Sequence, residues 1–170
     1  MAHLSKPLRT MKRIIILLLA LIPVATNAQQ FDVDTENGIV GWSKVCKSTM
    51  SQDEITQQIL AYDFLDNIVI HGNMIAADIK PIFLNYEGAG YTRMRSPIYI
   101  TNYMFTGRIL YQFKDGRFKV DVFNMKFVSD SLVYSYLNDC IGEFGFDIAQ
   151  KLIMQYLNSL TLFTPWNDEW

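Results

Sequence analysis

Histidine and cysteine are scarce in this sequence, which contains two of each among its 170 residues. A tetrahedral zinc site usually takes about four Cys, His or acidic ligands, with Cys and His at short spacing. Cys46, His71 and Cys140 are far apart in the chain, and the other histidine lies in a polar stretch near the start. We therefore expect no metal and no cofactor, and the sequence offers no catalytic motif.

No stretch of the chain stays apolar for the roughly 20 residues that a membrane-spanning helix needs. The longest apolar run, residues 14–22, follows two basic residues and precedes small residues that end at Ala28. A short basic start, an apolar segment and small residues before a cleavage point are typical of a secretory signal peptide. We interpret residues 1–28 as a signal peptide, with Met11 as an alternative start. The protein is then expected to be exported, periplasmic or secreted, and its mature chain to have no transmembrane segment.

Positive charge is sparse once the signal peptide is removed. The whole chain has a net charge of -2, and the four Lys and Arg residues before residue 28 leave with the leader, so the mature chain carries -6. Nucleic-acid binding needs clustered Lys and Arg against the phosphates, and this balance argues against it. The remaining length of about 142 residues is typical of a single domain.

The two cysteines allow two interpretations. Export would place Cys46 and Cys140 in an oxidising compartment, where they could form a disulfide. The alternative is a pair of small buried side chains, because unpaired cysteine is among the residue types most often found in protein interiors.

Residues 29–38 form a polar, acidic stretch, which we interpret as a spacer. The pattern of secondary structure can be predicted from the residues that follow. A single domain is expected over residues 39–160, followed by a tail at residues 161–170. The domain begins with an apolar strand at residues 39–46, and Ser51 and Glu54 then have the spacing of a capping box. That spacing predicts the start of a helix, which we place at residues 52–65.

Several β-strands are expected in the middle of the chain. A strand near residues 68–70, a Gly72-Asn73 turn and a strand at residues 74–84 form one hairpin, and the dipeptide Asp115-Gly116 predicts a second. With a two-residue loop, the facing residues are the pairs Lys114 with Arg117, Phe113 with Phe118, Tyr111 with Val120 and Ile109 with Val122. Beyond them, the apolar face switches sides near Asn124, which indicates a β-bulge.

A second helix is expected near residues 142–160. Ile148, Leu152, Tyr156 and Leu160 recur every four residues and form an apolar stripe suited to packing across a sheet.

The longest probable loop, residues 85–97, has no clear period and includes two tyrosines and two arginines. Loops of this length in a compact domain are often functional, so Tyr86, Tyr91, Arg93 and Arg95 are the candidate contact surface. The alternative is an ordinary solvated loop.

Three segments together resemble a known family: Gly41 to Val45, the capped helix with Tyr62 and Phe64, and Tyr111 to Phe118 around the Lys-Asp-Gly-Arg turn. They are similar to an exported domain-of-unknown-function family with a TATA-box-binding-protein-like (TBP-like) fold, from gut-type Gram-negative bacteria. The similarity is strongest over residues 39–128. It implies an α+β fold in the order β-α-β-β-β-β-α, with a curved antiparallel sheet and helices on one face.

Taken together, these features favour a non-catalytic module that binds a protein, peptide or glycan partner at the cell envelope. A carrier of a small hydrophobic ligand, held between the sheet and the C-terminal helix, is the alternative. A hydrolase that uses His71 is less favoured, because a lone histidine beside a tight turn lacks a recognisable catalytic partner.

Overall fold

The computed structural model describes residues 29–34, 39–130 and 132–164, so the proposed signal peptide lies outside the described residues. Its elements follow the chain as β1 (Gln29–Asp34), β2 (Ile39–Lys47), α2 (Gln52–Leu60), β3 (Leu65–His71), β4 (Met74–Ile82), η1 (Arg93–Arg95), α3 (Ile98–Thr101), β5 (Met104–Lys114), β6 (Arg117–Ser129), β7 (Leu132–Tyr136), η2 (Leu137–Cys140) and α4 (Phe146–Ser159). Among these residues, no helix is both long and apolar enough to cross a bilayer.

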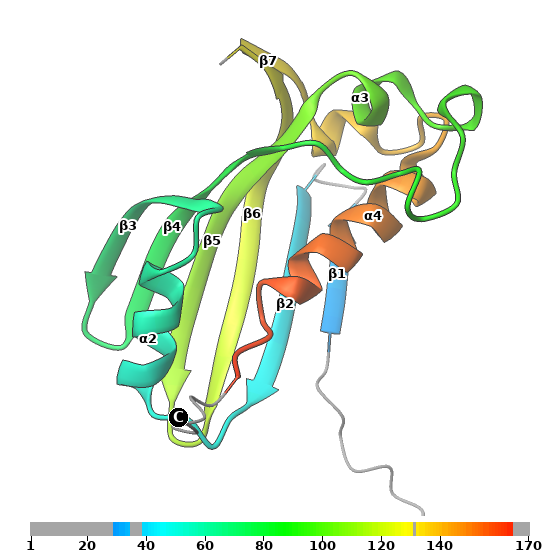
Figure 1. Ribbon diagram of the computed structural model, residues 1–170. Helices are drawn as coiled ribbons and strands as arrows, with labels where there is room; N and C mark the ends of the chain where they lie inside the picture. Colours follow the sequence, from blue (N-terminus) through cyan, green and yellow to red (C-terminus); the bar gives the residue numbers. More distant parts are fainter. Residues whose placement is uncertain (1–28, 35–38, 131, 165–170) are drawn as a thin grey trace, which may run out of the picture.

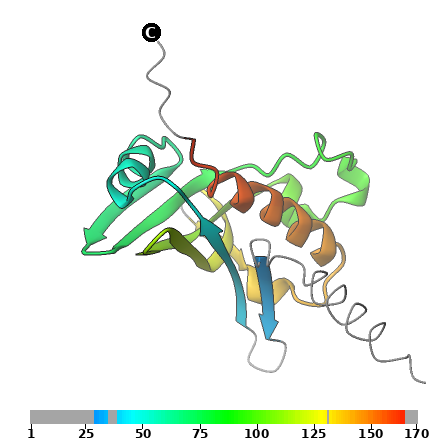
Figure 2. The ribbon, with the colours of Figure 1, turned by 90° about the horizontal axis from the view of Figure 1, so that it is seen from below.

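The strands form one antiparallel sheet in the order β1-β2-β6-β5-β4-β3, and β7 pairs with the far end of β6. Helices α2 and α4 lie over the same face of this curved sheet (Figures 1 and 2). The predicted α+β class, with an antiparallel sheet and helices on one face, is confirmed. The structure has two strands that the sequence did not predict, β1 and β7.

The first of these strands replaces the predicted spacer. Residues 29–34 pair with β2 in register, so that Phe31 faces Trp42 and Val33 faces Val40. Both apolar side chains of β1 pack against the core. A strand with only two apolar residues among polar ones is hard to recognise in sequence, and its pairing with β2 supplies the missing stability.

Helix α2 begins where the capping box predicts and ends five residues early. The Ser51 N–H donates to Glu54 Oε2 at 2.7 Å, and the Glu54 N–H donates to Ser51 Oγ at 3.3 Å. The helix stops at Leu60. Tyr62 and Phe64 lie beyond it, with their rings 4.5 Å apart.

The β5–β6 hairpin has the predicted register at every facing pair from Lys114 with Arg117 to Ile109 with Val122. The predicted bulge is also present, since Asn124 has a positive φ of 53° and the register shifts opposite Gly107. Val122 and Met125 are both buried across this bulge, although they are three residues apart. The bulge therefore keeps one apolar face turned inward along a thirteen-residue strand.

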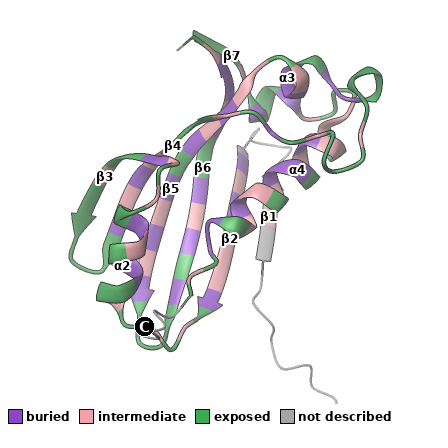
Figure 3. Cartoon of the chain, in the orientation of Figure 1, coloured by how far each residue is buried: buried purple, intermediate pink, exposed green. Residues whose placement is uncertain are grey.

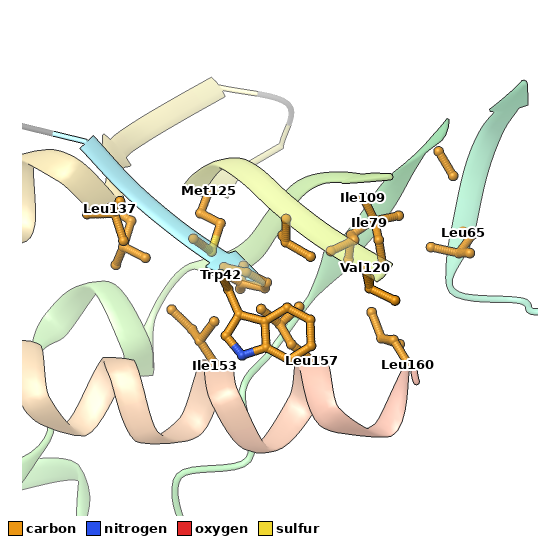
Figure 4. Close-up of a cluster of buried hydrophobic side chains, with 14 of the residues drawn as sticks. Trp42, Leu65, Ile79, Ile109, Val120, Met125, Leu137, Ile153, Leu157 and Leu160 are labelled. Atoms are coloured by element: carbon orange, nitrogen blue, oxygen red, sulfur yellow. The ribbon is translucent and has the colours of Figure 1, made fainter. Parts of the chain in front are cut away.

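The space between the sheet and α4 is filled by side chains. Trp42 points from β2 toward Ile153 and Leu157 of the helix, and all three are almost fully buried (Figure 4). The buried face of α4 comprises Ala149, Leu152, Ile153 and Leu157, so the predicted stripe is rotated slightly, with Ile148 and Tyr156 at its margins. Neither of the two hollows described below is lined by a residue of α4. A ligand carried between sheet and helix would have to displace this packing.

The predicted tail is partly integrated into the domain. Thr161 is buried, and Phe163 lies against Tyr62 and Phe118 with ring centroids 5.8 and 5.3 Å apart. Lys44 also secures the segment, because its Nζ donates to Thr161 Oγ1 at 2.9 Å. Residues 161–164 thus belong to the folded domain rather than to a tail.

Candidate functional site

The predicted contact loop separates its tyrosines from its arginines. Tyr86 and Tyr91 are partly buried against the core, and the Tyr91 N–H donates to the Tyr86 carbonyl at 2.9 Å. Arg93 and Arg95 are exposed on η1, and Arg93 donates to Asn102 Oδ1 at 3.2 Å. The tyrosines thus fasten the loop to the core, whereas the arginines face solvent.

The two cysteines are free thiols, both buried and not bonded to each other. Cys46 lies on β2, whereas Cys140 ends η2. Burial raises the pKa of both thiols above the ordinary value, which disfavours the reactive thiolate. The structure therefore supports the second interpretation of the cysteines, two small buried side chains, and not the disulfide.

His71 is exposed beside the β3–β4 turn. Within the described ranges, its ring takes part in no hydrogen bond or ion pair, and no group of three or more His, Cys, Asp or Glu side chains is placed to hold a metal ion. The hydrolase hypothesis thus gains no support from the surroundings of this residue.

The uncovered face of the sheet is polar in its middle. Arg108 lies 3.8 Å from Asp78, and Lys119 lies 2.7 Å from Asp121. Asn67 also donates to Asp78, at 3.0 Å. A surface occupied by paired charges is poorly suited to an apolar partner, so the middle of this face is not the best candidate contact surface.

A more distinctive surface lies at the end of the sheet that carries β7, opposite the β5–β6 turn (Figure 1). Three segments that are distant in sequence meet there around a hollow of about 380 Å³, which we call the β7 hollow. The segments are the start of α3, the middle of β7 and the connection from η2 to α4. The lining residues are Pro97, Ile98, Tyr99, Tyr134, Ser135, Asp139, Cys140, Glu143 and Phe144.

Large apolar side chains are exposed around this hollow. Phe144 is 72% exposed and Ile98 is 56% exposed, although both residues line it. Leu132 on β7 is 75% exposed, and Val133, Tyr134 and Tyr136 of the same strand are also exposed (Figure 3). Contiguous exposed apolar side chains of this size are uncommon on monomeric proteins and mark interaction sites.

The backbone of β7 adds a second feature. Within the described chain, β7 is hydrogen-bonded to β6 alone, so alternate N–H and C=O groups along its other side have no neighbouring strand. Natural proteins usually protect such edges with charged residues, proline or a covering element. The five residues of β7 include no charged residue and no proline.

The floor of the hollow holds a polar group without a partner. Tyr99 is 7% exposed, and its hydroxyl has no hydrogen-bond partner among the described residues. Its ring is fixed against Phe127, at a centroid distance of 5.0 Å. Burial is the main reason that the pKa of Tyr99 is raised well above its ordinary value, with further contributions from Cys140, Asp147 and Glu143. The surroundings of the phenol therefore disfavour its ionised form.

The rim of the hollow is also fixed in part. Tyr134 stacks on Tyr103 with ring centroids 3.7 Å apart, and Cys140 Sγ lies 3.5 Å from Ser135 Oγ. Gly145, the N-cap of α4, approaches Pro97 so closely that a Cβ there would lie 2.7 Å from Pro97 Cδ. These contacts hold the three lining segments against one another, so the site is largely preformed.

The opposite end of the sheet has a larger hollow of about 600 Å³ beside the β5–β6 turn, which we call the hairpin hollow. Its apolar floor is part of the core, since Phe113 and Phe118 are almost fully buried. Its rim carries three cations, Lys114, Arg117 and Lys119. Long charged side chains over buried aromatic rings are an ordinary solvated surface, and the hairpin hollow is the weaker candidate.

Sequence reasoning did not identify the β7 hollow. One signal was available, because residues 132–136 read Leu-Val-Tyr-Ser-Tyr between turn residues and are rich in strand formers. The hollow itself is formed by residues 97–99, 134–135 and 139–144, which no spacing rule connects.

Comparison with known proteins gives structural matches only. The sequence matches no family model, and no match is found among curated proteins. Among solved structures, the chain is similar to a TBP-like protein from Parabacteroides distasonis, with 14% identity and a TM-score of 0.46 over 78% of this chain and 99% of the other. It is also similar to a DUF4468 family protein from Bacteroides ovatus, with 14% identity and a TM-score of 0.42 over 77% and 91%. At 14% identity, both likenesses concern the fold alone.

Proposed function

We propose that this protein is an exported, non-catalytic module that binds an extended polypeptide segment at the β7 hollow. The observation that carries the proposal is the exposure of apolar side chains at the hollow and on the adjoining strand. Phe144 and Ile98, which line the hollow, and Leu132 of β7 are each more than half exposed. These side chains contribute little to the core, so their exposure has no explanation in folding.

The β7 edge accounts for the choice of an extended segment as ligand. A strand that joins a sheet edge gains main-chain hydrogen bonds regardless of its sequence, and the pockets beside the edge then select its side chains. Strand β7 offers such an edge, and the β7 hollow begins at Tyr134 and Ser135 of the same strand. A peptide laid along β7 would thus meet both the free backbone groups and the hollow.

Export is supported by the sequence alone, through the basic start, the apolar run and the small residues that end at Ala28. If this part of the proposal is right, the protein recovered from its host begins at Gln29 and lies outside the cytoplasm. An unprocessed chain found in the cytosol would overturn the envelope role, although the β7 hollow would be unaffected.

A displayed library of random peptides tests the binding function. Peptides selected on the mature chain are expected to lose at least about tenfold in affinity for Phe144→Ser, since the ring is at the mouth of the hollow. Leu162→Ser is the matched control, because Leu162 is 67% exposed but lies in the C-terminal segment, outside the hollow. Failure to select any peptide, or equal loss with both variants, would refute the proposed site.

A further inference from the structure

We propose that the β7 hollow selects a positively charged side chain, lysine or arginine, in the extended segment that it binds. This inference rests on the proposed function and adds the chemistry of the ligand. It follows from the charge of the lining, the aromatic rim and the unpartnered hydroxyl on the floor.

The charge of the lining has one sign. Two of the nine lining residues are acidic: Asp139, on η2, and Glu143, on the connection from η2 to α4. None of the nine is a lysine or arginine. Asp147, in the first turn of α4, is close enough to act on the Tyr99 hydroxyl. The arginines of η1 are the nearest cations in sequence, and neither lines the hollow. Arg93 donates to Asn102, and Arg95 is exposed. A cation in the hollow would therefore meet attraction from these carboxylates, and an anion would meet repulsion.

The aromatic rim favours the same ligand. Tyr134 and Phe144 line the hollow, and both are exposed, so part of each ring is accessible to a ligand, although Tyr103 covers one face of Tyr134. The face of an aromatic ring attracts ammonium and guanidinium groups, most strongly where water is partly excluded. Tyr134 is held by stacking on Tyr103, which reduces the entropy that a ligand must remove on binding.

The hydroxyl of Tyr99 gives an independent indication of a polar ligand. It is buried without a partner, and it interacts with Cys140 and Glu143, which line the hollow. An unsatisfied buried hydroxyl costs about 1–3 kcal/mol. Neighbouring atoms seal the oxygen in this structure, so an N–H donor would reach it only when a ligand displaces part of the lining. Lysine and arginine both carry N–H donors at the end of a long apolar stem that suits the exposed apolar rim.

Three synthetic probes test this preference. Each is a seven-residue peptide of alternating threonine and valine, capped at both ends, with a central lysine, a central norleucine or a central glutamate. We expect the lysine peptide to bind about tenfold more tightly than the norleucine peptide, and the glutamate peptide to bind most weakly. Titration with backbone amide shifts recorded by NMR gives both the affinity and the location of binding.

Two variants test whether Asp139 and Glu143 cause the preference for lysine. The double variant Asp139→Asn with Glu143→Gln is expected to bring the lysine and norleucine peptides to nearly equal affinity. The control is Asp115→Asn, which removes one charge at the β5–β6 turn, where Asn-Gly is as suitable as Asp-Gly. The control is expected to leave the preference unchanged.

The outcomes separate this inference from the proposed function. Equal binding of all three peptides, with shifts confined to the β7 hollow, would retain the binding function and overturn the charge preference. Binding that is absent, or that maps to the hairpin hollow, would refute both. A lysine preference that survives the double variant would also overturn the assignment to these carboxylates.

Discussion

The two ends of the sheet differ in how they treat apolar side chains. At the β5–β6 turn, Phe113 and Phe118 are turned inward and long cations cover the rim. At the β7 end, Phe144 and Leu132 point into solvent, and the rim carries carboxylates. One chain therefore closes its core at one end and leaves large apolar groups uncovered at the other.

The backbone shows the same contrast. The hairpin end is two regular strands joined by a two-residue turn, in which Gly116 supplies a positive φ of 66°. The β7 end is assembled from a five-residue strand, two helices of four residues and connections with positive φ at Asp130, Gly142 and Gly145. Binding residues are disproportionately found on irregular segments positioned by a rigid scaffold. The difference in shape between the two ends therefore agrees with the binding role proposed for the β7 end.

The largest expected effect at the β7 end comes from the glycine that joins its segments. Gly145→Ala is expected to reduce the free energy of unfolding by about 3 kcal/mol, because a Cβ at φ 76° is strained and would lie 2.7 Å from Pro97 Cδ. Gly142→Ala is the matched control, since Gly142 has φ 82° but no atom within 4 Å of its Cβ position. It is expected to cost about 1 kcal/mol. Urea unfolding of both variants measures the difference, and equal costs would show that the contact with Pro97 does not hold the hollow together.

Much of the hairpin end could be predicted because its signals are local. The Asp115-Gly116 dipeptide and the alternation of apolar residues fix the turn and the register without reference to the rest of the chain. The bulge at Asn124 was also visible, as a switch in that alternation. Strands β1 and β7 were missed because each is short, and their stability comes from pairing with distant residues.

At the hairpin end, Ser51 caps the start of α2 beside the β5–β6 turn. Ser51→Ala is expected to cost about 1 kcal/mol through loss of the helix cap. Hydrogen bonds from the Ser51 N–H and hydroxyl hold the pKa of Glu54 below its ordinary value of 4.5. The pKa of Glu54 is thus lower in the folded chain than in the unfolded chain. The stabilisation by the ionised Glu54 carboxylate is therefore present above about pH 4.5 and is lost as the pH falls through the folded pKa.

Urea unfolding at several pH values between 7 and 3 tests whether stability falls with pH in this direction. Glu54→Gln is expected to flatten part of the acid loss of stability, and Glu54 itself is exposed, so the change is small. A loss that is unchanged in the variant would assign the acid sensitivity to other carboxylates.

The candidate site was harder to predict than the fold. Tyr86 and Tyr91 have the composition of a contact loop, yet a loop without a period gives no information on which way its rings point, and both pack inward. The three segments around the β7 hollow come together through contacts such as the pairing of β7 with β6 and the approach of Gly145 to Pro97. Neither contact leaves a trace in local sequence.

The smallest expected effect on stability bears most directly on the comparison of the two ends. Phe144→Ala is expected to change the free energy of unfolding by less than about 0.5 kcal/mol, because the ring is 72% exposed and outside the core. Phe118→Ala, at the other end, is expected to cost about 3–5 kcal/mol, because that ring is 3% exposed. Urea unfolding measures both. If Phe144→Ala instead cost about 2 kcal/mol, the ring would be part of the fold, and its exposure would no longer argue for a ligand. A negligible cost, combined with lost peptide binding in the same variant, would mean that the ring serves binding rather than folding.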